Sequence, residues 1–139
     1  MFGLTKHQFL KKSKKALQET SVQSLSFRRL INQDAKDEIV ILEAHRSLDR
    51  LRNHADDTFA SYRKLNPPSK CLQLQQSIIN ALILFYDSLV AYSESLHAKE
   101  DGLEDKSSQL MEKSSEKLNK YIEISFSLSR EVDSNLQKK

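Results

Sequence analysis

The residues of this chain that could do acid–base or metal chemistry are few. Four histidines and one cysteine are the main candidates besides the carboxylates. One spacing is suggestive, because Glu94 and His97 lie three positions apart and would share one face of a helix. A two-metal site in a helical bundle needs such a pair on each of two helices, together with a glutamate from each of the other two. The pair occurs once, near a predicted helix end, so we expect no metal site here.

The other histidines and the cysteine lack a pattern that would indicate catalysis. His7 lies among lysines, while His45 and His54 lie next to arginines beside a predicted apolar seam, so all three are expected at the surface. Cys71 has no histidine partner that the sequence suggests, and it fits the apolar face of a helix as a buried thiol. The two glycines stand alone, which leaves no phosphate-binding loop. We therefore expect a non-enzymatic protein with no catalytic residue, cofactor or metal.

Length and composition indicate one helical domain over residues 1–139. The chain has 139 residues, of which 38% are hydrophobic and 29% charged, with 2 glycines, 2 prolines and 1 cysteine. So few glycines argue against a β-rich fold, which needs a turn about every 8–12 residues. One cysteine cannot form an internal disulfide. No stretch reads as a secretory signal or as a membrane span of about 20 apolar residues, so a cytoplasmic protein is expected.

Helical periodicity divides the domain into four segments. Apolar residues recur at steps of three and four, which is typical of amphipathic helices. Thr5 and Gln8 have the spacing of a capping box. A break is expected within residues 20–26, where serines and β-branched residues lower helix propensity, and Asp34 is the expected N-cap of the next helix. The predicted segments are a basic N-terminal helix or arm over residues 1–31 and long helices over residues 34–65, 69–100 and 103–137.

The connections between the long helices are short and carry clear end signals. Asn66-Pro67-Pro68 ends the second segment, because a residue before proline is pushed out of the α region. Asp101-Gly102 marks the next joint, since glycine can adopt the left-handed conformation at a helix end. Short connections make consecutive helices antiparallel neighbours. The predicted fold class is all-α, an elongated antiparallel helical bundle of three long helices plus a shorter basic N-terminal helix.

Positive charge is concentrated in the first segment. Residues 1–31 hold seven bases and the single acid Glu19, a net +6 that leaves −3 for the rest of the chain. Such a basic amphipathic helix can lie on an anionic membrane, contact nucleic-acid phosphates, or bind an acidic partner. The alternative is that it packs on the body through its apolar face, which includes Phe2, Phe9, Leu10 and Leu17. The residues expected to contact an anionic surface are Lys6, Lys11, Lys12, Lys14, Lys15, Arg28 and Arg29.

The third segment predicts a different surface. Apolar residues cover most of its circumference, whereas the second and fourth segments offer narrow apolar stripes. Part of this helix is therefore expected to stay uncovered in a slim bundle, and exposed apolar patches often mark contacts with other molecules. A second copy of the chain or a different protein could cover it, which makes a homodimer through this helix one possibility. The expected partner-binding residues are Ile79, Ile83, Leu84, Tyr86 and Val90.

Two functions follow as expectations. The first is a non-enzymatic protein–protein interaction module, such as an adaptor, a complex subunit or a small inhibitor, that acts through exposed helix faces. The alternative is a peripheral binder of an anionic surface, membrane or nucleic acid, that acts through the basic N-terminal helix.

Overall fold

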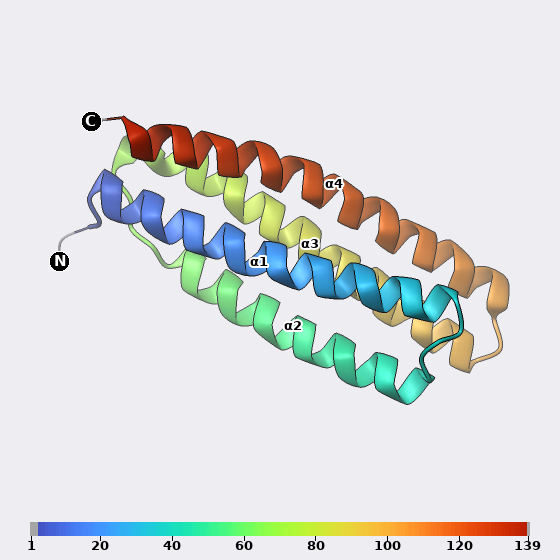
Figure 1. Cartoon of the computed structure of the whole chain (residues 1–139). Helices are drawn as coiled ribbons and strands as arrows, with labels where there is room; N and C mark the ends of the chain where they lie inside the picture. The colour runs from blue at the N-terminus through green and yellow to red at the C-terminus, as the bar shows by residue number, and fades with distance from the viewer. Residues whose placement is uncertain (1–2, 139) are drawn as a thin grey trace.

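The computed structural model describes residues 3–138, in which four α-helices lie side by side in an elongated bundle (Figure 1). Consecutive helices run in opposite directions, so both ends of the described chain and the connection between α2 and α3 lie at the same end of the bundle (Figure 1). The predicted all-α bundle is confirmed. The elements are α1 (Lys6–Ala35), α2 (Ile41–Arg63), the short 3-10 helix η1 (Ser69–Cys71), α3 (Leu72–Glu100) and α4 (Glu104–Gln137).

Helix α1 begins where the sequence predicts and continues further than predicted. The capping box forms, because the Gln8 amide donates to Thr5 Oγ1 at 3.1 Å and the Thr5 amide donates to Gln8 Oε1 at 2.9 Å. The predicted break within residues 20–26 is wrong: the Thr20 and Ser24 hydroxyls donate to carbonyls of the preceding turn, and the helix is unbroken. The N-terminal helix is therefore longer than α2 rather than shorter, and it spans Lys6–Ala35 instead of residues 1–31.

The end of α1 corrects the second predicted boundary. Asp34 is the expected N-cap of the next helix, but it belongs to the last turn of α1. Helix α1 ends in a Schellman motif, in which the Glu38 amide donates to the Gln33 carbonyl and the Asp37 amide to the Asp34 carbonyl. Asp37 occupies the left-handed position with φ 54°, where aspartate is tolerated better than most residues. Helix α2 consequently begins at Ile41 rather than near residue 34.

The other two connections follow the sequence signals. Helix α2 ends at Arg63, just before Asn66-Pro67-Pro68, and η1 leads directly into α3. The end of α3 is a second Schellman motif, in which Gly102 has φ 76° and the Leu103 amide donates to the Ala98 carbonyl at 2.9 Å. The two strongest end signals of the sequence are thus confirmed.

Helix α3 lies at the centre of the packing. It shares the largest interface with α4 and also packs against α2 and α1. By length and composition alone residues 69–100 would suffice to cross a membrane, a property that the core helix of a bundle can share. Cys71 is buried at its start, as expected. The most deeply buried large side chains come from all four helices: Phe9, Leu10, Leu17, Phe27, Leu48, Ile78, Phe85, Leu89, Tyr92, Leu96, Leu118 and Tyr121.

Buried serines lie in the interface between α3 and α4, where the two helices approach each other closely. Ser114 Oγ donates to the Ser88 carbonyl at 2.7 Å. Nearer the α3–α4 turn, Ser95 Oγ donates to the Ser107 carbonyl at 2.7 Å, and Ser107 Oγ donates to the Ser95 carbonyl at 2.9 Å. These bonds cross between helices, so they satisfy the buried hydroxyls and require the two backbones to lie near each other.

A buried polar contact fixes the end of α1 to α3. Asp34 is 5% exposed. It accepts a hydrogen bond from the Tyr92 hydroxyl at 2.8 Å and another from Lys99 Nζ at 3.1 Å. Burial, reinforced by the neighbouring carboxylate, raises the pKa of Tyr92 well above its ordinary value. Asp34 is thus a tertiary contact rather than a helix cap.

We expect Asp34→Ala to lower the free energy of unfolding by about 2–3 kcal/mol, because it leaves the buried Tyr92 hydroxyl without a partner. The Lys99 contact adds little to this figure, since its side chain is 42% exposed and solvent screens it. Urea denaturation measures the change. The matched control is Asp37→Asn. Asparagine tolerates the positive φ at this position, and the replaced side chain is 89% exposed. Equal effects of the two variants would contradict the role of Asp34.

Candidate functional site

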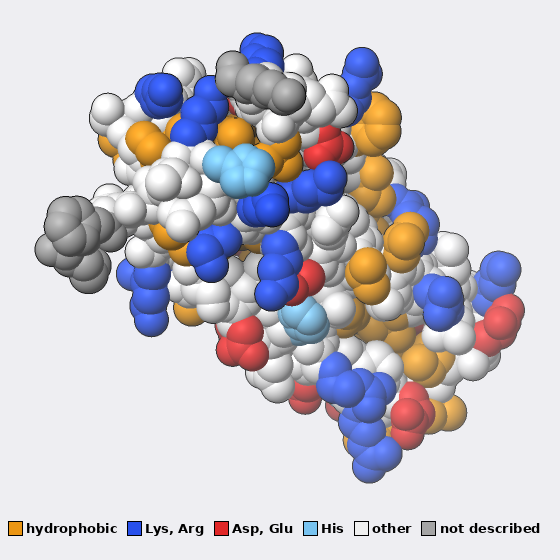
Figure 2. Space-filling view, turned by 60° about the vertical axis from the view of Figure 1, so that its left-hand side comes forward, with side chains coloured by type: hydrophobic (Ala, Val, Ile, Leu, Met, Phe, Trp, Pro, Cys, Tyr) orange, Lys and Arg blue, Asp and Glu red, His pale blue; other side chains and the backbone are white. Residues whose placement is uncertain are grey.

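The described structure gathers positive side chains at one end of the bundle. The antiparallel arrangement brings the end of α2 and the start of α3 next to the first turns of α1. Figure 2 shows many lysine and arginine side chains and few acidic ones around this end. We call this surface the basic end; it contains Lys6, Lys11, Lys12, Lys14 and Lys15 of α1, Arg63 at the end of α2, Lys64 just after it, Lys70 of η1, and Lys138 after α4.

The opposite end of the bundle has the reverse bias. It holds the connections α1–α2 and α3–α4, where acidic residues outnumber bases. The bundle is therefore electrostatically polar along its axis, which the net charge of +3 alone does not reveal. The acidic residues at this end include Asp34, Asp37, Glu38, Glu43, Glu100, Asp101, Glu104 and Asp105.

The predicted anion-contacting residues fall into two groups. Lys11, Lys12 and Lys15 are exposed at the basic end. There Lys14 forms an ion pair with Asp133 of α4 at 3.0 Å, and Lys6 is partly buried. The other two predicted residues, Arg28 and Arg29, lie about 20 Å further along α1 at 1.5 Å per residue, and Arg28 donates to Asn119 of α4. The seven residues thus do not form one patch.

The apolar face of α1 faces the bundle core. Phe9, Leu10 and Leu17 are at most 2% exposed, while Phe2 lies outside the described residues. Leu4 packs on the core as well, and its amide donates to the Asn66 carbonyl at 2.9 Å, which ties the chain before α1 to the α2–α3 connection. The apolar face of the described part of α1 is therefore in the core, although Val22 and Leu25 on another side of the helix are 60% and 66% exposed.

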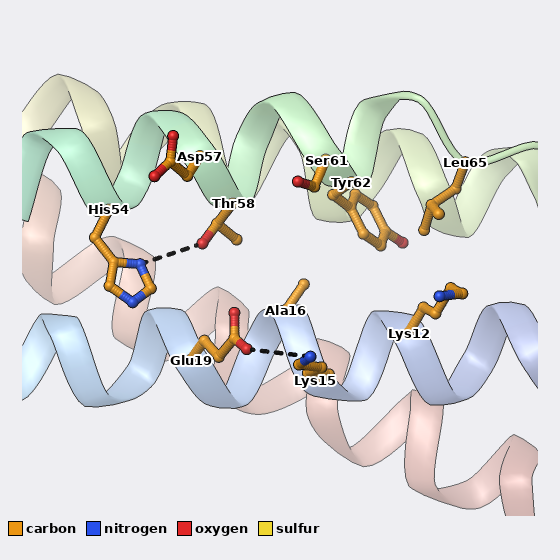
Figure 3. Close-up of a pocket in the computed structure, with 10 residues that line it drawn as sticks. All are labelled: Lys12, Lys15, Ala16, Glu19, His54, Asp57, Thr58, Ser61, Tyr62 and Leu65. Atoms are coloured by element: carbon orange, nitrogen blue, oxygen red, sulfur yellow. Dashed lines mark hydrogen bonds and ion pairs between the residues drawn. The ribbon is translucent and has the colours of Figure 1, made fainter.

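A groove runs between α1 and α2 at the basic end, with a volume of about 470 Å³ (Figure 3). The Tyr62 ring and Ala16 contribute apolar surface to it. The Tyr62 hydroxyl is held by Ser13 Oγ at 2.7 Å, which links the two helices. Burial raises the pKa of Tyr62 above its ordinary value, so this hydroxyl stays protonated further into the alkaline range than that of an exposed tyrosine. The groove is lined by Lys12, Lys15, Ala16, Glu19, His54, Asp57, Thr58, Ser61, Tyr62 and Leu65.

Charge is not uniform along this groove. Lys12 lies toward the end that holds Leu65, whereas Glu19, Asp57 and His54 lie toward the other end (Figure 3). Lys15 lies between them and forms an exposed ion pair with Glu19 at 3.8 Å. The groove can therefore offer cations to a ligand at one end and carboxylates at the other, above an apolar floor.

The five residues predicted on the third helix are only partly covered. Ile79 and Leu84 pack against the core at its margin, and Val90 is half-buried. Ile83 is 42% exposed. Tyr86 is half-buried beneath Arg52 of α2, whose guanidinium lies 5.8 Å from the ring centroid. They are spread along α3, and Tyr86 already has an intramolecular partner.

Sequence reasoning missed the contribution of α2 and η1 to the basic end. The signal was present, because Asn66-Pro67-Pro68 predicts that the chain reverses there. A reversal places Arg63, Lys64 and Lys70 near the start of any helix that runs antiparallel to α2. The groove could not be predicted from the sequence, because it depends on which faces of α1 and α2 pack together.

Comparisons of the chain with known protein families, with curated proteins and with solved structures find no match.

Proposed function

We propose that this protein is a non-enzymatic interaction module, working in the cytoplasm as an adaptor, a complex subunit or a small inhibitor, which binds an acidic segment of another protein in the α1–α2 groove. The observation that carries the proposal is the position of the groove within the basic end. The groove has an apolar floor and lysines along one side. It therefore suits a polypeptide segment whose acidic residues face Lys12 and Lys15.

The carboxylates at one end of the groove favour a protein as its ligand over a polyphosphate or a lipid surface. Glu19 and Asp57 would repel a ligand that carries negative charge along its whole length. A polypeptide can avoid this repulsion by placing acidic residues at one end and neutral or basic residues at the other. Insertion into lipid also lacks support, because the described apolar face of α1 is in the core.

The alternative function keeps one specific observation in its favour. Cations from four elements meet at the basic end, and such a concentration can bind an anionic membrane or nucleic acid without a groove. That binding would engage the exposed lysines Lys11, Lys12 and Lys15 together with Arg63, Lys64 and Lys70. It would depend steeply on salt and little on the groove floor.

We expect the double variant Lys12→Glu and Lys15→Glu to weaken partner binding at least about tenfold, because it replaces two attractive contacts by two repulsive ones. A photo-crosslinking amino acid at Ser61, an exposed position that lines the groove, would capture the occupant in cells. Discrete protein adducts are expected with the otherwise unchanged chain and should be lost in the double variant.

The matched control is Lys106→Glu and Lys113→Glu on α4, which changes the net charge equally at exposed positions away from the basic end. It should leave the adducts unchanged. If both double variants weaken binding alike, net charge matters and the groove does not. Binding of the purified protein to anionic vesicles or to duplex DNA, without protein adducts at Ser61, would replace the proposal by the alternative.

A further inference from the structure

Two histidines and a carboxylate from α2 and α3 lie close together at the end of the bundle opposite the basic end. His45 lies in the second turn of α2, and His97 and Glu100 lie in the last turn of α3. His45 Nε2 is 2.6 Å from Glu100 Oε1, and His97 Nδ1 is 3.7 Å from the same oxygen. The two imidazole rings have centroids 5.3 Å apart. One nitrogen of each ring and one carboxylate oxygen all lie within 4.8 Å of one another.

We propose that His45, His97 and Glu100 bind a divalent transition metal ion, with zinc as the expected one. Imidazole nitrogen and carboxylate oxygen are zinc ligands at about 2.0–2.2 Å, so tetrahedral geometry places neighbouring ligand atoms roughly 3.3 Å apart. The separations of 2.6 Å and 3.7 Å lie on either side of that value. The two imidazole nitrogens lie within 4.8 Å of each other, so rotations of these exposed side chains would have to bring them closer for all three donors to reach one ion. The fourth position remains for water or a ligand from outside.

The surroundings favour a cation at this place. The C-terminal end of α3 carries the negative pole of the helix dipole, and His97 and Glu100 belong to its last turn. The nearby Lys99 points to Asp34 and Asp37 instead, at 3.1 Å and 3.9 Å. All three side chains are accessible, because His45, His97 and Glu100 are 25%, 68% and 44% exposed. An ion can therefore enter from solvent without opening the bundle.

The site is independent of the groove and has its own structural effect. His45 precedes His54, the groove residue of α2 nearest to it, by nine positions, about 14 Å along the helix axis. Helix α2 offers few fully buried side chains, namely Ala44, Leu48, Leu51 and Tyr62. A metal held by His45 from α2 and by two residues from α3 would fasten the first half of α2 to the bundle.

The test is a calorimetric titration of the purified protein with zinc ion alone. We expect one ion per chain, and at least tenfold weaker binding in His97→Ala and in Glu100→Gln. His54→Ala is the matched control, because His54 is also an exposed histidine of α2 but lies outside the cluster. Cobalt substitution supplies a second readout, since its visible spectrum reports a tetrahedral nitrogen and oxygen site. Thermal unfolding should shift upward with zinc in the unchanged protein and not in His97→Ala.

Two results would overturn the proposal. One is the absence of stoichiometric zinc binding, which would leave the cluster as a hydrogen-bonded contact of His45 with Glu100. The other is equal weakening by His54→Ala and His97→Ala, which would indicate scattered surface binding. Unfolding of a variant can be distinguished from loss of a metal ligand. His97 is largely exposed, and circular dichroism of each variant checks its helix content.

Discussion

Replacing Phe27 by alanine is expected to lower the free energy of unfolding by about 3–5 kcal/mol, the usual cost of removing a fully buried phenylalanine. The Phe27 side chain is 0% exposed. Its ring forms edge-to-face pairs with Phe85, at a centroid distance of 6.2 Å, and with Tyr92, at 5.6 Å. Such edge-to-face pairs add roughly 0.5–1.5 kcal/mol each beyond the burial itself. Urea denaturation followed by circular dichroism measures the loss.

The matched control is Leu25→Ala on the same helix. Leu25 is 66% exposed and alanine suits a helix at least as well, so its effect should stay within about 0.5 kcal/mol. A loss below about 1 kcal/mol for Phe27→Ala would show that α1 does not stay packed on the bundle in solution. The apolar face of α1 would then be free, and a lipid-binding role of the N-terminal helix would regain support.

The fold was largely predictable because its signals are local and strong. The capping box at Thr5, the reversal at Asn66-Pro67-Pro68 and the left-handed Gly102 each act through neighbouring backbone atoms. The α1–α2 boundary was predicted wrongly for the opposite reason. Asp34 resembles a helix cap in sequence, but its partners Tyr92 and Lys99 lie far along the chain and only the packed structure reveals them.

The expected break in α1 shows how tertiary packing outweighs propensity. Serine and β-branched residues favour other conformations by a few tenths of a kcal/mol each. Burial of Phe27 alone stabilises the helical path by several kcal/mol, and the hydroxyls of Thr20 and Ser24 find acceptors inside the helix. A propensity argument over residues 20–26 therefore fails once the following turn is anchored in the core.

The candidate sites were predictable only in part. The lysines of α1 are visible in the sequence as a charge asymmetry, whereas the groove depends on the pairing of α1 with α2. The cluster of His45, His97 and Glu100 depends on the register between α2 and α3, which no local pattern encodes. Sequence spacing instead singled out Glu94 with His97, but Glu94 does not belong to the cluster that the structure brings together.

Stability is expected to fall steeply above about pH 10, because three tyrosines are buried in the core. Tyr62 is 3% exposed, and Tyr92 and Tyr121 are 0% exposed. Burial is the main cause that raises the pKa of each above its ordinary value of about 10. Below pH 10 both the folded and the unfolded chain keep these protons. Above it the unfolded chain loses them while the folded chain does not, so unfolding becomes easier.

The slope approaches about 1.4 kcal/mol per unit of pH for each tyrosine once the unfolded chain has lost that proton and the folded chain still holds it. Urea denaturation at a series of pH values between 9 and about 11 measures it. Tyr121→Phe is the sharpest comparison, because the Tyr121 hydroxyl is buried without a hydrogen-bond partner among the described residues. Its removal breaks no hydrogen bond of ordinary geometry, so the variant should be about as stable near pH 7 and should lose stability less steeply above pH 10 than the unchanged protein. An unchanged slope would mean that the Tyr121 phenol ionises in the folded protein, and that α1, α3 and α4 do not exclude water from it.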